Sequence, residues 1–299
     1  MHVVRGRSEG SSWEVAWRPA HPLLRAHVHR LIGFTETSGG PLRRLELPSG
    51  KVALIVGFGG DGWTLEHNGS TSAHHAFVAG VHGTAAYTEQ TGTVTGIQAD
   101  LTPLGAHRLL AMSMRDLAGE VVAFDDLLER DAGARSLPEQ LAGAKDWRAR
   151  LDLADAWLIG RIAAGPEPAP GVEWAVGRLR ATRGAVPVRA LTEELGWSRR
   201  HLAERFREQV GVPPKALGRV LRFEHAIEIL GRAGAGDTDL GRVALDCGYY
   251  DQSHFNRDFR DFSGMAPRAW LAQRAPDGGI ARAVEQEVTS VQDGTARAA

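Results

Sequence analysis

Apolar residues spaced four apart, on either side of a glycine, occur twice in the last third of the chain. Such spacing places apolar side chains on one face of a helix, and a glycine between two short helices permits a sharp turn. The first copy consists of Leu191, Leu195, Gly196, Leu202 and Phe206, and the second of Val243, Cys247, Gly248, Phe255 and Phe259. Each copy therefore predicts two short helices joined by a glycine turn.

The residues after the second helix repeat as well. FREQVGVPPK begins at Phe206 and FRDFSGMAPR at Phe259, and in both an Arg and an acid follow Phe, with Gly five and Pro eight places after it. Ser198 and Asp251 are the expected N-caps of the second helices, and the second turn is one residue longer. A duplicated unit of this kind predicts two helix-turn-helix motifs and hence DNA binding.

Between the copies, residues 215–232 predict one continuous helix, because apolar residues recur at helical spacing and Pro213 and Pro214 stand where a helix tolerates proline. Such a helix holds the two units at a fixed separation. At a separation of about 34 Å, both second helices enter successive major grooves on one face of DNA.

The first part of the chain has a different pattern. Residues 40–103 contain short apolar runs separated by glycines, which predict a small antiparallel barrel or sandwich. Helices are expected at Leu104–Met112, Leu137–Lys145 and Trp147–Ala164, the last with an apolar stripe of Leu151, Leu158 and Ile162. The fold class is therefore α+β.

Changes in composition divide the chain. We expect a sensor or dimerisation domain at residues 1–165, a short linker at 166–171 with the sequence PEPAPG, a DNA-binding domain at 172–275, and a disordered tail at 276–299. Residues 171–275 hold 17 Lys and Arg against 13 Asp and Glu, a net charge of +4, whereas the rest hold 18 against 23, a net charge of −5. The basic part suits nucleic acid.

Other features of the composition exclude several classes of protein. The single cysteine excludes a disulfide framework. No apolar run approaches the roughly 20 residues of a membrane span, and no signal-peptide core is visible, so a cytoplasmic protein is expected.

The second half resembles the DNA-binding domain of the AraC/XylS family of bacterial transcription regulators. The resemblance rests on LTEELGWSRRHLAERFREQVGVPP and VALDCGYYDQSHFNRDFRDFSGMAPRAW, within residues 172–273, and the second stretch corresponds to the family signature. It implies sequence-specific binding of double-stranded DNA, more often activation through RNA polymerase than repression, and a cupin-like N-terminal barrel that binds a small-molecule effector. The alternative is an N-terminal domain that only forms a homodimer or docks a protein partner.

The solvent-facing positions of the second helices are the predicted DNA contacts. They are Arg199, Arg200, Ala203, Glu204 and Arg207 in the first unit, and Gln252, Ser253, His254, Asn256, Arg257 and Arg260 in the second. Arg suits guanine, Gln or Asn suits adenine, and Glu accepts from a cytosine amine. By resemblance, the base-reading positions are Arg200, Ala203, Glu204, Gln252, Ser253, Asn256 and Arg257. Arg207, Arg260 and Arg268 are expected at phosphates or neighbouring carboxylates.

Other residue types with chemical potential have simpler interpretations. Cys247 is expected in the core. The histidines at 67, 74, 75 and 82 match no metal-ligand spacing and are expected at strand ends. GFGGDG at residues 57–62 follows a strand but precedes no helix pattern, which indicates a turn rather than a phosphate site. Trp63, Phe77 and Tyr87 are expected as core, or as the lining of an effector pocket. No catalytic set is evident, so neither an enzyme nor a cofactor is predicted.

Overall fold

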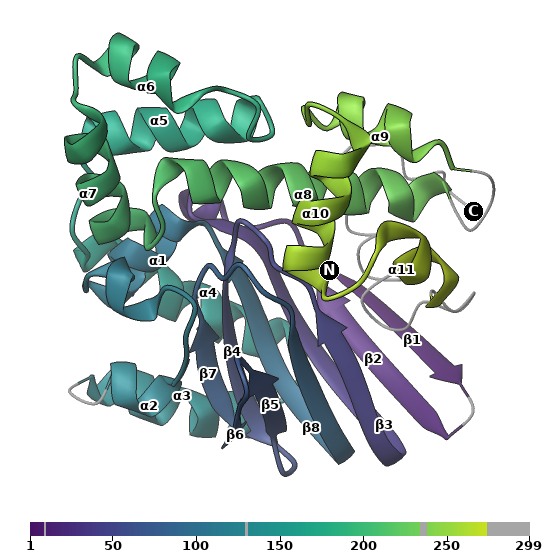
Figure 1. Ribbon diagram of the computed structural model, residues 1–299. Helices are drawn as coiled ribbons and strands as arrows, with labels where there is room; N and C mark the ends of the chain where they lie inside the picture. The colour runs from purple at the N-terminus through teal and green to yellow at the C-terminus, as the bar shows by residue number, and fades with distance from the viewer. Residues whose placement is uncertain (9, 129–130, 234–237, 274–299) are drawn as a thin grey trace.

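The computed structural model describes residues 1–8, 10–128, 131–233 and 238–273, and confirms an α+β fold with an antiparallel sheet followed by helices (Figure 1). The expected tail at 276–299 lies outside the described residues. Among the described helices, none combines the length and the apolar character that a membrane span requires.

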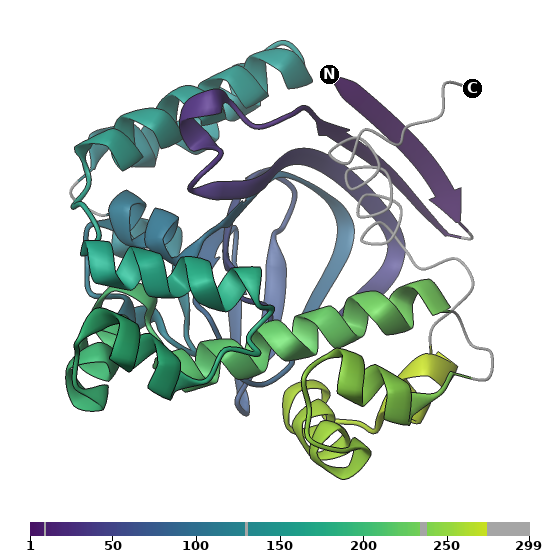
Figure 2. The ribbon, with the colours of Figure 1, turned by 90° about the horizontal axis from the view of Figure 1, so that it is seen from above.

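The sheet contains nine strands within the described residues, in the order β1-β2-β3-β8-β4-β7-β9, with β5 paired to β8 and β6 paired to β5. The strands are β1 (His2–Ser8), β2 (Ser11–Trp17), β3 (Val28–Glu46), β4 (Val52–Gly59), β5 (Trp63–His67), β6 (Ser70–His74), β7 (Ala76–Ala79), β8 (Ala86–Leu101) and β9 (Val121–Ala123). All pairings between these strands are antiparallel, and the sheet is strongly curved (Figure 2).

The β-rich region begins well before residue 40, where the sequence analysis placed its start. The hairpin β1–β2 and most of β3 precede that position. β1 is largely exposed, and β2 buries the consecutive residues Val15, Ala16 and Trp17, so neither strand shows the short apolar run between glycines from which strands were predicted. β3 continues through an irregularity between Ser38 and Leu42 and pairs with β8 from Val28 to Glu46.

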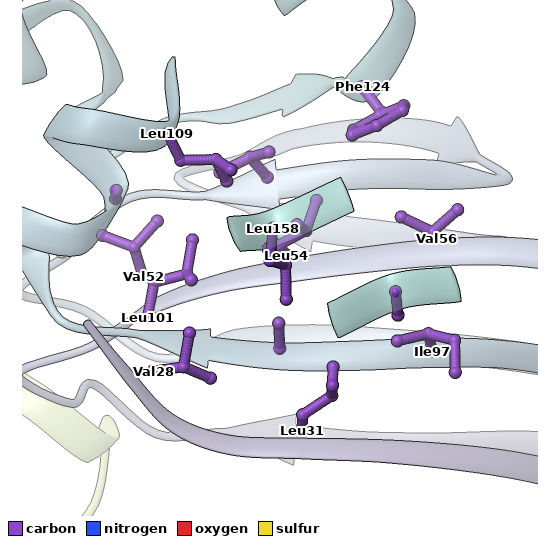
Figure 3. Close-up of a cluster of buried hydrophobic side chains, with 14 of the residues drawn as sticks. Val28, Leu31, Val52, Leu54, Val56, Ile97, Leu101, Leu109, Phe124 and Leu158 are labelled. Carbon is purple, nitrogen blue, oxygen red and sulfur yellow. The ribbon is translucent and has the colours of Figure 1, made fainter. Parts of the chain in front are cut away.

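Helices cover one face of the sheet and form its main core (Figure 3). They are α1 (Pro103–Leu110), α2 (Phe124–Leu127), α3 (Ala132–Gly143) and α4 (Trp147–Ala164), with the 3-10 helices η1 (Pro22–Leu24) and η2 (Met114–Leu117). The predicted stripe of Leu151, Leu158 and Ile162 on α4 is buried in this core. α3 starts five residues before its predicted position, because Asp131 caps it by accepting from the N–H of Ala134 at 3.1 Å.

The remaining described helices build the duplicated unit. They are α5 (Pro170–Ala181), α6 (Val188–Leu195), α7 (Arg199–Val210), α8 (Pro214–Ala233), α9 (Leu240–Asp246), α10 (Gln252–Ser263) and α11 (Pro267–Gln273). The caps are confirmed: Ser198 accepts from the N–H of His201 at 3.1 Å, and Asp251 from that of His254 at 2.7 Å. Gly196 and Gly248 have φ of 66° and 75°, the left-handed conformation that the turns require.

α8 joins the two units and belongs to both of their cores. Leu217 and Leu221 pack with α5, α6 and α7, whereas Val220 and Phe223 pack with α9 and α10. The α7 and α10 helices contact α8 at well-separated places along it (Figure 1).

Polar contacts fix the second unit on α8. The guanidinium of Arg219 donates to Asp258 at 2.8 Å and to Asp261 at 3.0 Å, both on α10. Arg222 donates to the carbonyl of Gly184, in the turn after α5, and its guanidinium lies 5.4 Å from the ring centre of Tyr249. The two units are therefore connected through side chains of α8 as well as through its backbone.

The sheet contacts this helical part through the turn between β3 and β4. Lys51 pairs with Glu224 of α8 at 3.0 Å, and the N–H of Gly50 donates to the same carboxylate. From α5, Arg180 donates to the carbonyl of Gly50 at 2.9 Å and to Nε2 of His29 at 2.6 Å. One turn of the sheet is thus held by α5 and α8 of the helical part.

The contact between Arg180 and His29 predicts that the stability of the fold depends on pH. Burial, followed by the Arg180 and Lys51 cations, lowers the pKa of His29 from 6.5 to about 4. Between those values the unfolded chain binds a proton that the folded chain does not, so stability falls as the pH is lowered. We expect His29→Gln, which still accepts from Arg180 but does not titrate, to reduce the loss between pH 7 and pH 5 by about 1–2 kcal/mol.

Urea denaturation at the two pH values measures this difference. His75→Gln, at an exposed position, is the matched control and should behave like the wild type. An identical pH dependence in the wild type and His29→Gln would show that His29 does not carry the effect.

Candidate DNA-binding interface

The first candidate reading helix, α7, buries one face and exposes the other. Leu202, Phe206 and Val210 lie in the core between α5, α6 and α8. On the opposite side, the candidate residues Arg199, Arg200, Glu204 and Arg207 are exposed, and Ala203 is half-buried at the border. The Ser198 cap fixes where the helix begins, so these side chains project from a defined position.

Two of the exposed residues of α7 are paired with each other. Nε of Arg200 donates to Glu204 at 2.8 Å, one helical turn away. The hydrogen bond from Arg200 holds the pKa of Glu204 below its ordinary value, with further contributions from the charges of Arg200, His201 and Arg115. Glu204 therefore carries a negative charge at the centre of the exposed face, and its carboxylate holds the Arg200 side chain in an ion pair.

The second candidate helix, α10, presents Gln252, Ser253, Arg257 and Arg260 to solvent. His254 and Asn256 are half-buried. The His254 ring lies edge-on to Tyr249 with centroids 5.2 Å apart, and Oδ1 of Asn256 is buried without a partner among the described residues. Gln252, Ser253, Arg257 and Arg260 are consequently the more accessible members of this set.

The exposed arginines differ in their pairing. Unlike Arg200, the side chains of Arg199, Arg207, Arg257 and Arg260 form no ion pair with any carboxylate in the described part of the chain. The same holds for the exposed Arg268. Unpaired guanidinium groups on exposed helix faces suit phosphate oxygens or guanine.

The N-terminal half contributes to the surroundings of α7, which the sequence did not indicate. Ser113, just before η2, donates to Glu208 at 3.2 Å. The backbone is so close that a Cβ on Gly211 would lie 2.8 Å from the carbonyl oxygen of Met114. η2 therefore packs beside the carboxyl end of the first candidate reading helix, through contacts far apart in the sequence.

Other candidate residues have structural environments. Burial, with a smaller contribution from Asp246, raises the pKa of the Cys247 thiol to about 11, and the side chain lies in the core as predicted. Trp63 and Phe77 are buried against each other, whereas Tyr87 lies under the guanidinium of Arg43. Of the predicted turn at 57–62, residues 57–59 extend β4, and only residues 60–62 form the connection to β5.

The four histidines lie near the ends of β5, β6 and β7. His67 contacts Thr84 at 3.1 Å and His74 contacts Ser72 at 2.8 Å. His82 contacts the carbonyl of Gly80, and His75 is exposed. Within the described residues, no group of His, Cys, Asp and Glu has the arrangement of a metal site.

Comparison with known proteins identifies the helical half. Residues 191–273 match the family described as "Helix-turn-helix domain", which includes both units from α6 to α11. The chain carries an AraC-type helix-turn-helix domain. It is accordingly a DNA-binding transcription regulator, as the resemblance implied.

Comparison with solved structures found several matches to this chain. ToxT from Vibrio cholerae has a TM-score of 0.45 and 10% identity, over 81% of this chain and 97% of that chain. A probable AraC family transcriptional regulator from Rhodopseudomonas palustris has a TM-score of 0.31 and 27% identity, over 36% of this chain and 100% of that chain. The C-terminal domain of AraT, a response regulator from Geobacillus stearothermophilus, has a TM-score of 0.33 and 21% identity, over 36% of this chain and 89% of that chain. No curated protein sequence matches the chain.

The pair on α7 generates a prediction. Glu204→Gln removes a negative charge from the exposed face and releases Arg200, so we expect tighter binding to DNA of unrelated sequence, in which no cytosine amine donates to Glu204. The affinity should rise about three- to tenfold at low salt, and the slope of log K against log salt should steepen by about one. Gel shifts over a salt series measure both. Glu193→Gln, which breaks the comparable exposed pair with Arg189 on α6, is the control, and equal gains in both variants would contradict a specific role of Glu204.

Proposed function

We propose that this AraC-type regulator binds double-stranded DNA by placing α7 and α10 in successive major grooves on one face of the duplex. The observation that carries the proposal is the pair of capped helices with exposed arginines, both packed on the single helix α8. A helix whose amino-terminal end enters the groove reads bases with its first turns. The residues 172–275 form the proposed DNA-binding domain.

Roles within this interface are proposed from the resemblance to the AraC/XylS family. Arg200, Ala203 and Glu204 on α7, and Gln252, Ser253, Asn256 and Arg257 on α10, are the proposed base readers. Arg199, Arg207, His254 and Arg260 flank them and are proposed to contact the sugar-phosphate backbone, which fixes the register of the helices.

The proposal predicts different effects for two arginines of α10. Arg257→Ala removes a base contact, so binding to the selected site should weaken about 5- to 100-fold with little change on unrelated DNA. Arg260→Ala removes a phosphate contact and should weaken binding to both nearly equally, with a salt slope smaller by about one.

Selection of bound sites from random DNA, followed by gel shifts, tests these roles. Two half-sites about one helical turn apart would support the docking. If neither arginine variant loses affinity for the selected site, α10 does not read it as proposed.

We also propose where this regulator acts and with what. By family resemblance, it works in the cytoplasm, where DNA is accessible, and contacts RNA polymerase to activate transcription. The same resemblance suggests assembly as a homodimer through the N-terminal part.

A second candidate function is control by a small molecule. A groove of about 470 Å³ lies over β1, β2 and β3, lined by Arg5, Gly6, Arg7, Ser12, Trp13, Glu14, Thr35 and Thr37. Its volume is within the range of ligand sites, and arginine and hydroxyl groups suit a small hydroxylated anion. By contrast, the apolar cavity of about 10 Å³ between the sheet and α3 and α4 is too small for such a ligand.

Thermal shift measurements with small hydroxy-acids and sugar phosphates test this candidate. We expect at least one to raise the Tm of the wild type by several degrees and to have no effect on Arg7→Ser. If no member of the panel distinguishes the two proteins, the alternative remains, in which the N-terminal part only dimerises or docks a protein partner.

A further inference from the structure

The contacts within the two glycine turns show which residues of one turn correspond to which residues of the other. Trp197 follows Gly196 and its ring lies 4.6 Å from that of His201, the third residue of α7. Tyr249 follows Gly248 and its ring lies 5.2 Å from that of His254, the third residue of α10. In both units the backbone N–H of this histidine donates a hydrogen bond to the side chain of the cap residue. Trp197 and Tyr249 are therefore structurally equivalent.

This equivalence shows which residue the longer second turn adds. In the first unit the cap, Ser198, directly follows Trp197, whereas in the second Tyr250 stands between Tyr249 and the cap, Asp251. Tyr250 is the inserted residue and has no counterpart in the first unit.

Packing does not account for the tyrosine at this position. Tyr249 is 3% exposed and packs against Phe255, but Tyr250 is 87% exposed. The Tyr250 side chain takes part in none of the ring contacts or hydrogen bonds found among the described residues. An exposed tyrosine offers both an apolar ring and a phenol O–H, which together can pack against a partner and hydrogen-bond to it.

Its place in the chain indicates which partner. Tyr250 lies immediately before the cap of α10, so its side chain is carried at the amino-terminal end of the helix, next to the exposed Gln252 and Ser253. In a docked helix-turn-helix this end lies at the groove, and the residues just before it lie at the level of the phosphates.

We propose that Tyr250 is a DNA-backbone contact that only the second unit possesses, with its phenol O–H donating to a phosphate oxygen and its ring against the adjacent deoxyribose. The inference rests on the proposed docking of α10 and adds to it a contact outside the helix. Because the phenol is neutral, the contact strengthens binding to all sequences without displacing a counterion. With this contact, the second unit contributes more than the first unit to the affinity for DNA of any sequence.

The test compares full-length wild type, Tyr250→Phe, Tyr250→Ala and Arg260→Ala in gel shifts over a salt series, on the selected site and on unrelated DNA. Tyr250→Phe should raise Kd about three- to tenfold on both DNAs with an unchanged salt slope. Tyr250→Ala should raise it further, because the ring is also lost. Arg260→Ala supplies the contrast, a loss accompanied by a smaller salt slope.

Each result separates the inference from the function on which it rests. Tyr250 is so exposed that both of its variants should melt at the wild-type temperature, which excludes misfolding as the cause of a loss. If both variants bind within twofold of the wild type while Arg260→Ala loses affinity, the Tyr250 contact is wrong and the docking stands. If the wild type selects no DNA, the docking fails with it. Normal DNA binding with lost transcription in Tyr250→Ala would place the side chain against RNA polymerase and overturn the inference.

Discussion

The arrangement of this molecule depends on the burial of one helix, α8, in two cores at once. Leu217 and Leu221 complete the first helix-turn-helix unit, and Val220 and Phe223 complete the second. A helix is stiff over its length, so neither unit can turn without breaking apolar contacts with α8. The ion pairs from Arg219 to Asp258 and Asp261 add a directional constraint on α10. The relative placement of α7 and α10 is therefore a property of packing, not of a flexible tether.

The same helix couples the DNA-binding half to the sheet. Leu221 lies against Gly50, where an added Cβ would be 2.7 Å from its methyl carbon, and Glu224 holds Lys51 of the same turn. At the other end of the first unit, η2 packs beside α7. A change in the N-terminal part can therefore reach the first helix-turn-helix unit through two sets of direct contacts, one at the turn of Gly50 and Lys51 and one at η2. Coupling between sites requires contiguous contacts of this kind, each with a differential effect on the two arrangements.

The sequence predicted the features that local chemistry determines. Both glycine turns, both caps and the buried stripes of α4, α7 and α10 follow from spacing and from the conformational preferences of glycine, serine and aspartate. Features that depend on distant residues were not predictable. β1 is largely exposed, lacks a strong apolar signal of its own, and is a sheet strand because it pairs with β2. The His29–Arg180 contact joins residues 151 positions apart, and the half-buried state of Asn256 depends on packing around α10.

The hairpin at the start of the chain has a consequence for the behaviour of the protein at high concentration. β1 ends the described sheet, and its outer row of N–H and C=O groups is a template on which another strand could add. Arg5 pairs with Glu14 of β2, whereas Arg7 is exposed and forms no ion pair among the described residues. Two copies that met edge to edge with their Arg7 side chains close together would therefore repel each other. Like charge at an open edge disfavours growth into fibres.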